Sequence, residues 1–465
     1  MDIYLMGIGG SAMGALAGLL KSQGHQIRGS DSRVYSPMRE KLADWGISYI
    51  TPYDAQNLEK KPELIIVGNV IRRENPEALI MREKNLPHES LPSALKRLFL
   101  DKSCSIVASG THGKTTCSAL MAHVLYKNNH DPGFLIGGIP INFNESFRAP
   151  CPEKSVFVVE GDEYDTAYFD KKPKFMHYRP DLLLLTSIEF DHADIYPNLD
   201  AVIKAFSTLL ATLDSDKKLI INNIDLNIQK ALSQAQCQAQ IMTYGPLGNY
   251  QALSPAFLPS GLKFSVILDG QDQGEISIPL FGRHNLANAL GCYALLHQYG
   301  LSHEQISRGF KSFLGVKRRL EVRFETKNFI GIDDFAHHPT AVGETIKAAR
   351  QKYPDHAIIA IFEPRSATSA SKIFSADYIQ ALAQADRVIL APVGRLLAED
   401  QKLPTKEIAH KIRDLGKKAS AYDNYEDFKE EVLHLEPGSV LLFMSNGDLG
   451  GSLQAIENSF LEKNF

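Results

Sequence analysis

The sequence predicts an α/β protein of three consecutive domains, each with a sheet of mainly parallel strands. Two observations support this fold class: short apolar runs alternate with helical patterns along the chain, and two strand-to-helix junctions are rich in glycine. A chain of 465 residues is also too long for one hydrophobic core and suggests roughly three domains. We place the domains at residues 1–102, 103–316 and 317–465.

The composition is that of a globular protein and argues against several other classes. Apolar residues make up 44% of the chain and charged residues 22%, which is typical of a globular protein. The formal charge of −4 argues against nucleic acid as the main partner. The five cysteines show no CxxC spacing, which favours reduced thiols in a cytoplasmic protein over disulfides or a zinc site. We expect neither a signal peptide nor a membrane span, because the N-terminus leads directly into a glycine loop and the apolar runs are short.

The first domain opens with a candidate nucleotide loop. An apolar strand at 3–6 precedes the loop 7–11, and a helical stretch follows. Such a loop lets a diphosphate approach a helix N-terminus, and an acid after the next strand can accept a hydrogen bond from a ribose. The residues predicted to bind a phosphorylated ligand here are Gly9, Gly10, Ser11, Ser30, Asp31 and Asn69. The motif alone would also suit a nicotinamide-dependent dehydrogenase or a turn without a ligand.

The most informative segment lies at the start of the second domain. The apolar run 105–108 leads into a loop at 109–116 with two glycines and a lysine, and a helical stretch follows. Backbone N–H groups of such a loop face a phosphate, Lys114 adds a positive charge, and the hydroxyl of Thr115 can hold Mg²⁺. The predicted nucleotide-binding residues are Gly110, Thr111, His112, Gly113, Lys114, Thr115 and Thr116.

Two further strands end in residues suited to metal and phosphate chemistry. Glu160 follows the apolar strand 156–159, where a carboxylate beside a phosphate loop can bind Mg²⁺. His192 follows the strand 182–185 and is predicted to hold a second Mg²⁺ or to position a reacting phosphate group. The predicted metal ligands are therefore Thr115, Glu160 and His192.

A helix from about Asn285 to Gln298 is predicted near the end of the second domain. Asn285 and Asn288 can either cap this helix or read the edge of an adenine, and the sequence leaves both interpretations open. The stretch from about 245 to 280 is rich in glycine, proline and alternating residues, which favours a β-rich insertion.

The third domain begins with basic residues. Its apolar strands are predicted at 357–362, 387–390 and 439–444. Arg319 is predicted to bind the γ-phosphate as it transfers, although a basic linker is the alternative. Asp334 and His337 follow another apolar run, so we expect them at the rim of this sheet, in nucleotide and substrate binding respectively. This domain is expected to close over the nucleotide and exclude water.

Together these motifs resemble those of the Mur ligase family across essentially the whole chain. The short loop Gly-Thr-His-Gly-Lys-Thr-Thr at 110–116, with Ala108 in place of the first glycine of the common phosphate-loop pattern, is similar to the loop of this family. Further segments that look like it are 29–31, 34–38, 137–140 with 142–143, 163–165 with 168–171, 189–194, 333–340, 363–366 and 444–447. The resemblance implies a Rossmann-like UDP-binding domain, a central P-loop ATPase domain and a C-terminal Rossmann-like domain.

The resemblance also implies an ATP-dependent amide ligase that uses Mg²⁺. The first domain would bind UDP-N-acetylmuramate, the second ATP, and the third the incoming amine. ATP would phosphorylate the lactyl carboxylate, and the amine of the murein tripeptide L-alanyl-γ-D-glutamyl-meso-diaminopimelate would attack the acyl phosphate, as in peptidoglycan recycling. The alternative within the family is the biosynthetic ligase that adds free L-alanine.

Arg365, after the strand 357–362, is predicted to bind a carboxylate of the tripeptide, because a guanidinium forms a bidentate fork with that group. A surface arginine is the alternative. Two positions depart from the family pattern: Gly161 replaces a common alanine, and Ala367 stands where recycling ligases often have asparagine. Lys204 lies where several Mur ligases carry a carbamylated lysine, but we do not assign that modification here.

Two other classes of protein fit these motifs less well than a ligase does. A nicotinamide-dependent dehydrogenase would leave Lys114 and Thr115 without a role. A P-loop switch or motor would need a surface for a protein partner, which the sequence does not indicate. A ligase uses both glycine loops, with Lys114, His192 and Arg319 acting in catalysis.

Overall fold

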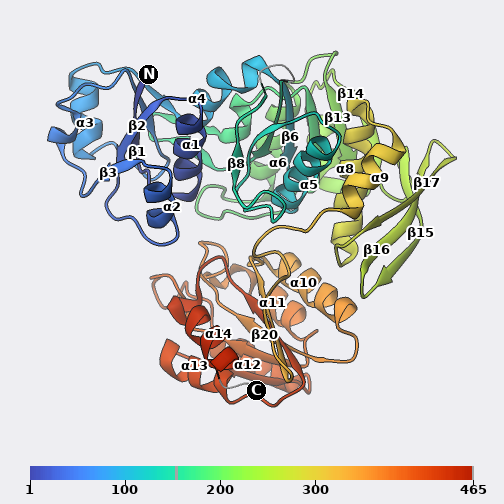
Figure 1. Cartoon of the computed structure of the whole chain (residues 1–465). Helices are drawn as coiled ribbons and strands as arrows, with labels where there is room; N and C mark the ends of the chain where they lie inside the picture. The colour runs from blue at the N-terminus through green and yellow to red at the C-terminus, as the bar shows by residue number, and fades with distance from the viewer. Residues whose placement is uncertain (152–154, 463–465) are drawn as a thin grey trace.

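The computed structural model describes residues 1–151 and 155–462, which form three main sheets in chain order. In Figure 1 the N-terminal part, drawn in blue, lies beside the middle part, drawn in cyan to yellow. The C-terminal part, drawn in orange to red, lies below both. The C-terminal part therefore faces the region where the N-terminal and middle parts meet.

The N-terminal sheet has five parallel strands in the order β3-β2-β1-β4-β5. Its strands are β1 (Asp2–Met6), β2 (Gln26–Ser30), β3 (Ser48–Ile50), β4 (Leu64–Val67) and β5 (His88–Ser90). Its helices are α1 (Ser11–Ser22), α2 (Met38–Asp44), α3 (Pro76–Glu83) and α4 (Leu91–Leu98). Ile3 and Leu5 face one core and Tyr4 and Met6 the other, so both faces of the sheet are covered.

The middle sheet has ten strands in the order β17-β16-β15-β14-β13-β12-β6-β9-β7-β8. They are β6 (Cys104–Ser109), β7 (Gly133–Leu135), β8 (Phe147–Arg148), β9 (Val156–Gly161), β12 (Leu182–Leu185), β13 (Lys218–Asn222), β14 (Gln240–Tyr244), β15 (Tyr250–Leu258), β16 (Gly261–Leu268) and β17 (Gln271–Ile278). The strands β10 (Asp165–Ala167) and β11 (Asp170–Pro173) form a separate antiparallel pair. The core strands are parallel, whereas β15, β16 and β17 form the antiparallel extension predicted at 245–280.

Five helices complete the middle part. They are α5 (Lys114–Lys127), α6 (Leu199–Leu210), α7 (Leu226–Gln234), α8 (Arg283–Tyr299) and α9 (His303–Lys311). The apolar residues of α5 and α8 belong to the core on one face of the sheet, and those of α6 belong to the core on the other. This covering of both faces explains why strands such as β12 are uniformly apolar rather than alternating.

The C-terminal sheet has six strands in the order β18-β19-β23-β20-β21-β22, and only β18 is antiparallel to its neighbour. The strands are β18 (Glu321–Glu325), β19 (Phe329–Asp334), β20 (Ala357–Phe362), β21 (Arg387–Leu390), β22 (Lys418–Ala421) and β23 (Ser439–Met444). The helices are α10 (Pro339–Lys352), α11 (Ser375–Leu382), α12 (Thr405–Asp414), α13 (Tyr425–Leu433) and α14 (Ser452–Glu462). All three strands predicted for this domain are confirmed.

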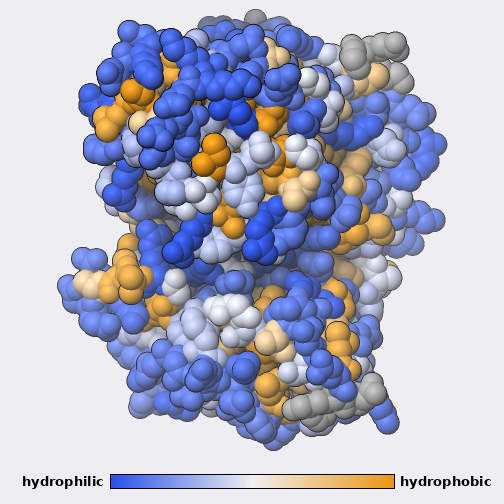
Figure 2. All heavy atoms as spheres, turned by 60° about the vertical axis from the view of Figure 1, so that its left-hand side comes forward, coloured by the Kyte–Doolittle hydropathy of each residue, from blue (hydrophilic) through white to orange (hydrophobic). Residues whose placement is uncertain are grey.

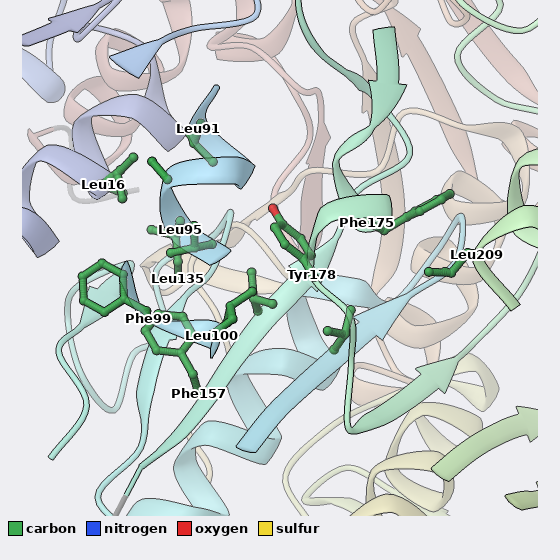
Figure 3. Close-up of a cluster of buried hydrophobic side chains, with 14 of the residues drawn as sticks. Leu16, Leu91, Leu95, Phe99, Leu100, Leu135, Phe157, Phe175, Tyr178 and Leu209 are labelled. Atoms are coloured by element: carbon green, nitrogen blue, oxygen red, sulfur yellow. The ribbon is translucent and has the colours of Figure 1, made fainter. Parts of the chain in front are cut away.

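The N-terminal and middle parts share one hydrophobic core. Leu16, Leu95 and Phe99 of the first part belong to the same buried cluster as Phe157 and Tyr178 of the second. Figure 3 shows the side chains of both parts pointing toward one another across the junction. Because apolar burial at this junction is continuous, the two parts are held together as one packed unit.

The C-terminal part has hydrophobic cores of its own, built on the two faces of its sheet. Its contacts with the middle part include polar pairs such as Thr340–Glu189. Figure 2 shows a hollow between the upper and lower parts of the molecule, bordered largely by hydrophilic residues. Polar interfaces of this kind favour relative motion, which agrees with the expectation that this part closes over a ligand. Among the described residues, none of the helices is both long and apolar enough to cross a membrane.

Candidate active site

The carboxyl edges of two sheets face each other. The strands β6, β9 and β12 are parallel neighbours, so the segments that follow them lie at one edge of the middle sheet. The segment after β19 in the C-terminal sheet meets that edge, because Thr340 donates to Glu189 over 2.7 Å and His338 Nε2 lies 3.2 Å from the carbonyl oxygen of Phe190. The predicted residues of both parts therefore surround a common space.

The loop between β6 and α5 has the conformation expected of a phosphate cradle. Gly110 and Gly113 adopt φ angles of +126° and +86°, which only glycine tolerates readily. A Cβ on Gly110 would lie 2.3 Å from the hydroxyl of Thr186, and one on Gly113 would lie 2.5 Å from Asn288 Oδ1. Gly113 precedes the first turn of α5, whose unpaired N–H groups attract an anion.

Lys114 is held by a carboxylate that sequence reasoning missed. Its Nζ donates to Glu163 Oε2 over 2.8 Å and to the carbonyl oxygen of Gly110 over 2.6 Å. Burial would lower the pKa of Lys114, but the charges of Glu163 and Asp162 raise it above its ordinary value. The lysine is therefore cationic and positioned beside the loop.

Glu163 joins Lys114 to His192. His192 Nε2 lies 3.0 Å from Glu163 Oε1, and the side chain of Glu163 is only 2% exposed. Burial lowers the pKa of His192, but its hydrogen bond and charge interaction with Glu163 raise it overall. The signal for Glu163 was the acidic run after β9, in which it lies two residues beyond the strand.

Two of the three predicted metal ligands lie together. Glu160 is positioned at the end of β9, where its Oε1 accepts from the Gly137 N–H over 2.7 Å. Burial raises the pKa of Glu160, while hydrogen bonds from Gly137 and Thr115 and the charge of Lys114 oppose that rise. A carboxylate and a hydroxyl are the hard oxygen donors that fit Mg²⁺. His192 is directed toward Glu163 instead, so its role as a metal ligand stays a prediction.

The asparagines at the start of α8 do not cap that helix. Gly282 is the N-cap residue and makes no side-chain cap bond. Asn285 lies inside the first turn and donates to the carbonyl oxygen of Phe281 over 2.9 Å, and Asn288 donates to Asn285 over 3.1 Å. Of the two interpretations left open, N-capping is therefore wrong. The contact between Asn288 and Gly113 places both amides beside the phosphate loop.

Arg319 lies where the chain enters the C-terminal sheet. Its guanidinium is 5.3 Å from the ring centroid of Phe335, and it forms no ion pair within residues 1–151 and 155–462. Burial raises the pKa of Glu160 and lowers that of His337, and the nearby charge of Arg319 opposes the first shift and adds to the second. The preceding Arg318 forms an ion pair with Asp333, with 3.1 Å between Arg318 Nε and Asp333 Oδ2. Of these two arginines, Arg319 is the one free to meet an anion.

Asp334 is buried and His337 is partly buried among protein groups. Asp334 accepts from the N–H groups of Leu320 and Ala336, each over 2.8 Å, and so fixes the entry of the chain into the sheet. His337 Nε2 lies 3.9 Å from Asp191, and burial lowers its pKa. Their proposed contacts with nucleotide and substrate stay predictions.

The N-terminal loop is built as the sequence suggested, with one difference. Asp31 accepts from the Gly9 N–H over 2.9 Å, and Gly10 is the N-cap residue of α1. Ser11 and Asn69 are exposed at the same edge. Ser30 is fully buried and donates to Glu77 over 2.5 Å, so it supports the loop from below rather than facing its opening.

Arg365 follows β20 at the carboxyl edge of the C-terminal sheet. Its Nη1 pairs with Asp448 at 2.9 Å, and the two side chains are 43% and 70% exposed. Gly447 lies directly against it, since a Cβ there would be 2.1 Å from Nη1. An exposed pair of this kind is weak, which leaves the guanidinium accessible to a stronger anion. Lys204 is exposed on α6.

The chain is similar to known proteins over its full length. Residues 2–103 match the model described as the Mur ligase family catalytic domain, residues 108–296 the Mur ligase middle domain, and residues 318–447 the Mur ligase glutamate ligase domain. An Escherichia coli protein named UDP-N-acetylmuramate–L-alanyl-γ-D-glutamyl-meso-2,6-diaminoheptandioate ligase is 36% identical over 464 residues, covering 100% of this chain and 99% of that relative.

Two further relatives bear on the comparison. A Clostridium botulinum protein named UDP-N-acetylmuramate–L-alanine ligase is 31% identical, covering 96% of this chain and 95% of that relative. The crystal structure of a murein peptide ligase from Psychrobacter arcticus superposes with a TM-score of 0.75 at 29% identity and covers 99% of this chain and 98% of the other. With three matching domain models and full-length relatives, the chain belongs to the Mur ligase family.

Proposed function

We propose that this chain is an ATP-dependent ligase that joins UDP-N-acetylmuramate to L-alanyl-γ-D-glutamyl-meso-diaminopimelate, in peptidoglycan recycling in the cytoplasm. The observation that carries the proposal is the full-length similarity, at 36% identity, to a ligase named for that tripeptide. The phosphate loop, the Lys114–Glu163–His192 group and the facing C-terminal edge supply the parts that such a reaction needs.

The reaction would proceed through an acyl phosphate. A lactyl carboxylate oxygen attacks the γ-phosphorus of ATP, the bond to the β–γ bridging oxygen breaks, and ADP leaves. The tripeptide amine then attacks the acyl carbon, inorganic phosphate leaves, and an amide remains. Each step brings anions together, so positive charge must be positioned in advance.

Several residues of this chain would supply that positive charge. Lys114 and the N-terminus of α5 would bind the β- and γ-phosphates, and Arg319 would approach from the C-terminal part. Glu160 and Thr115 would hold Mg²⁺, which supplies further positive charge at the transferring phosphate. When an ATP phosphate replaces Glu163 at Lys114, His192 becomes able to contact the reacting group.

The two substrates would occupy the remaining edges. The loop 7–11 and the N-terminus of α1 would bind the UDP diphosphate, with Asp31 holding the loop. Arg365 would bind a carboxylate of the tripeptide in exchange for Asp448. His337, whose Nε2 lies 3.9 Å from Asp191, would also contact a substrate from the C-terminal part.

The second candidate is the ligase that adds free L-alanine, which the 31% identity to the Clostridium botulinum relative favours. Incubation with ATP, Mg²⁺ and UDP-N-acetylmuramate, with tripeptide in one arm and L-alanine in the other, separates the two by product mass. Product formed with tripeptide alone supports the proposal. Equal or better use of L-alanine overturns it in favour of the second candidate.

Arg365→Ala adds a second test of acceptor choice. The variant should raise the KM for tripeptide far more than the KM for ATP or the UDP-sugar, because only the tripeptide contacts this guanidinium. The exposed Arg413 of α12 offers a matched control, since Arg413→Ala leaves the carboxyl edge intact. Normal tripeptide kinetics in Arg365→Ala would remove this residue from the acceptor site.

A further inference from the structure

A group of three side chains lies across the interface between the middle and C-terminal parts. His112 comes from the phosphate loop, Glu189 from the segment after β12, and His338 directly precedes α10. His112 Nε2 is 3.4 Å and His338 Nδ1 is 3.7 Å from the same oxygen, Glu189 Oε2. Within residues 1–151 and 155–462, this is the only group of at least three histidine, cysteine or acidic side chains whose ligand atoms all lie within 4.8 Å of one another.

The hydrogen bond of His338 determines which of its two ring nitrogens carries no proton. Its Nε2 lies 3.2 Å from the carbonyl oxygen of Phe190, which can only accept, so Nε2 carries the proton. Nδ1 therefore points a lone pair toward Glu189 and, being fully buried, has no hydrogen-bond partner in the described chain.

The carboxylate of Glu189 lies at the centre of the group, within 4 Å of both histidine rings. Thr340 donates to Glu189 Oε2 over 2.7 Å and so orients the carboxylate. His112 Nε2 is also buried without a hydrogen-bond partner among the described residues. The buried nitrogens His112 Nε2 and His338 Nδ1 are thus left without a hydrogen-bond partner beside one carboxylate oxygen, an arrangement that a cation bound between them would satisfy.

The geometry points to a transition-metal site at His112, Glu189 and His338, which would take a divalent cation of the Zn²⁺ class and link the phosphate loop to the C-terminal part. Two imidazoles and one carboxylate are a common ligand set for Zn²⁺ and a poor one for Mg²⁺. The bond from His338 Nε2 to a carbonyl oxygen is the outer-shell contact that metal-ligating histidines usually make. The site shares no residue with the predicted Mg²⁺ ligands Thr115, Glu160 and His192, and it does not depend on the proposed function.

Direct metal binding to the full chain tests this site. Zn²⁺ is titrated calorimetrically in excess Mg²⁺, and Co²⁺ is added in parallel because its visible spectrum reports nitrogen ligands. We expect one equivalent of either ion to bind in the presence of Mg²⁺. Wild-type protein that binds neither ion, or that loses the ion to Mg²⁺ at equal concentration, would overturn the inference.

Variants assign the ligands. His338→Ala and Glu189→Gln should lose the Co²⁺ spectrum and the stoichiometric Zn²⁺ binding. Thr340→Val, which removes only the orienting hydroxyl, should bind Zn²⁺ about 10–100-fold more weakly. His410→Ala is the matched control, because this exposed histidine pairs with Asp414 within α12 and should bind as wild type does. Unchanged Zn²⁺ binding in His338→Ala or Glu189→Gln would place the metal elsewhere and contradict the assignment.

Discussion

At the scale of single residues, the chemistry of this site depends on exchangeable charge pairs. Lys114 and His192 share Glu163, and Arg365 pairs with Asp448. Each pair holds a cationic or donor group in position and is open to an anionic ligand of higher charge. A buried cation without such a partner would be costly, which gives Glu163 a physical purpose in the free protein.

Lys114→Ala should reduce ligation by about 10²–10³-fold at saturating ATP, because it removes one preorganised charge facing the β- and γ-phosphates. Steady-state ADP release measures the effect. Lys171→Ala is the control, since that lysine is 71% exposed and pairs with Asp165 at the surface. Turnover near that of wild type in Lys114→Ala would remove the loop from catalysis.

Glu160→Gln and His192→Ala should both raise the Mg²⁺ concentration that gives half-maximal activity, and Glu160→Gln should raise it more. The reason is that Glu160 lies with Thr115 as an oxygen donor, whereas His192 is directed toward Glu163. Titration of activity with Mg²⁺ measures the shift, with the exposed Glu275→Gln as the control. An identical Mg²⁺ requirement in all variants would mean that neither residue is a ligand.

At the scale of elements, the sequence predicted the strand-loop-helix units better than their contacts. The apolar run 105–108 and the glycines that follow it specify a local unit, so the loop and α5 were predicted correctly. The contact between Asn288 and Gly113 joins segments far apart in the chain, and no local pattern encodes it. For the same reason the meeting of Glu189 with Thr340 was not predicted.

Gly113→Ala should weaken ATP binding and lower the free energy of unfolding by about 1–3 kcal/mol, because φ is +86° and the new Cβ would displace Asn288. Gly416→Ala is a matched control, since Gly416 has φ of +81° with nothing within 4 Å of its Cβ position. Calorimetric ATP titration and thermal unfolding separate the two effects. Equal ATP affinity in the two variants would exclude a role for the Gly113–Asn288 contact.

At the scale of the whole molecule, two kinds of junction have different consequences. The N-terminal and middle parts share a hydrophobic core, whereas the C-terminal part has its own cores. Chain length and the pattern of apolar residues indicated three sheets. They carried no information on which two of the three parts would share a hydrophobic core. The shared core is consistent with one rigid unit that binds two nucleotides, with the third part free to move against it. The domain boundaries at 102 and 316 stay predictions.

Phe157→Ala should lower the stability of the N-terminal and middle parts together, by about 3–5 kcal/mol, because it opens a cavity in their shared core. The single tryptophan, Trp45, packs on Phe147 at this junction, so its fluorescence reports the unfolding of that unit. Phe362→Ala, in the C-terminal core, is the control and should leave the Trp45 transition unchanged. If Phe157→Ala did not shift the unfolding transition reported by Trp45 fluorescence, the shared core would be contradicted.

The claim that this chain is a ligase acting through an acyl phosphate is tested most directly by following one oxygen. UDP-N-acetylmuramate labelled with ¹⁸O in its lactyl carboxylate is incubated with ATP, Mg²⁺, tripeptide and the protein, and the released phosphate is examined by mass spectrometry. The account predicts that one ¹⁸O atom appears in inorganic phosphate for each amide formed, and that Lys114→Ala slows this transfer and amide formation together by about 10²–10³-fold. Unlabelled phosphate, or release of AMP and pyrophosphate in place of ADP, would contradict it.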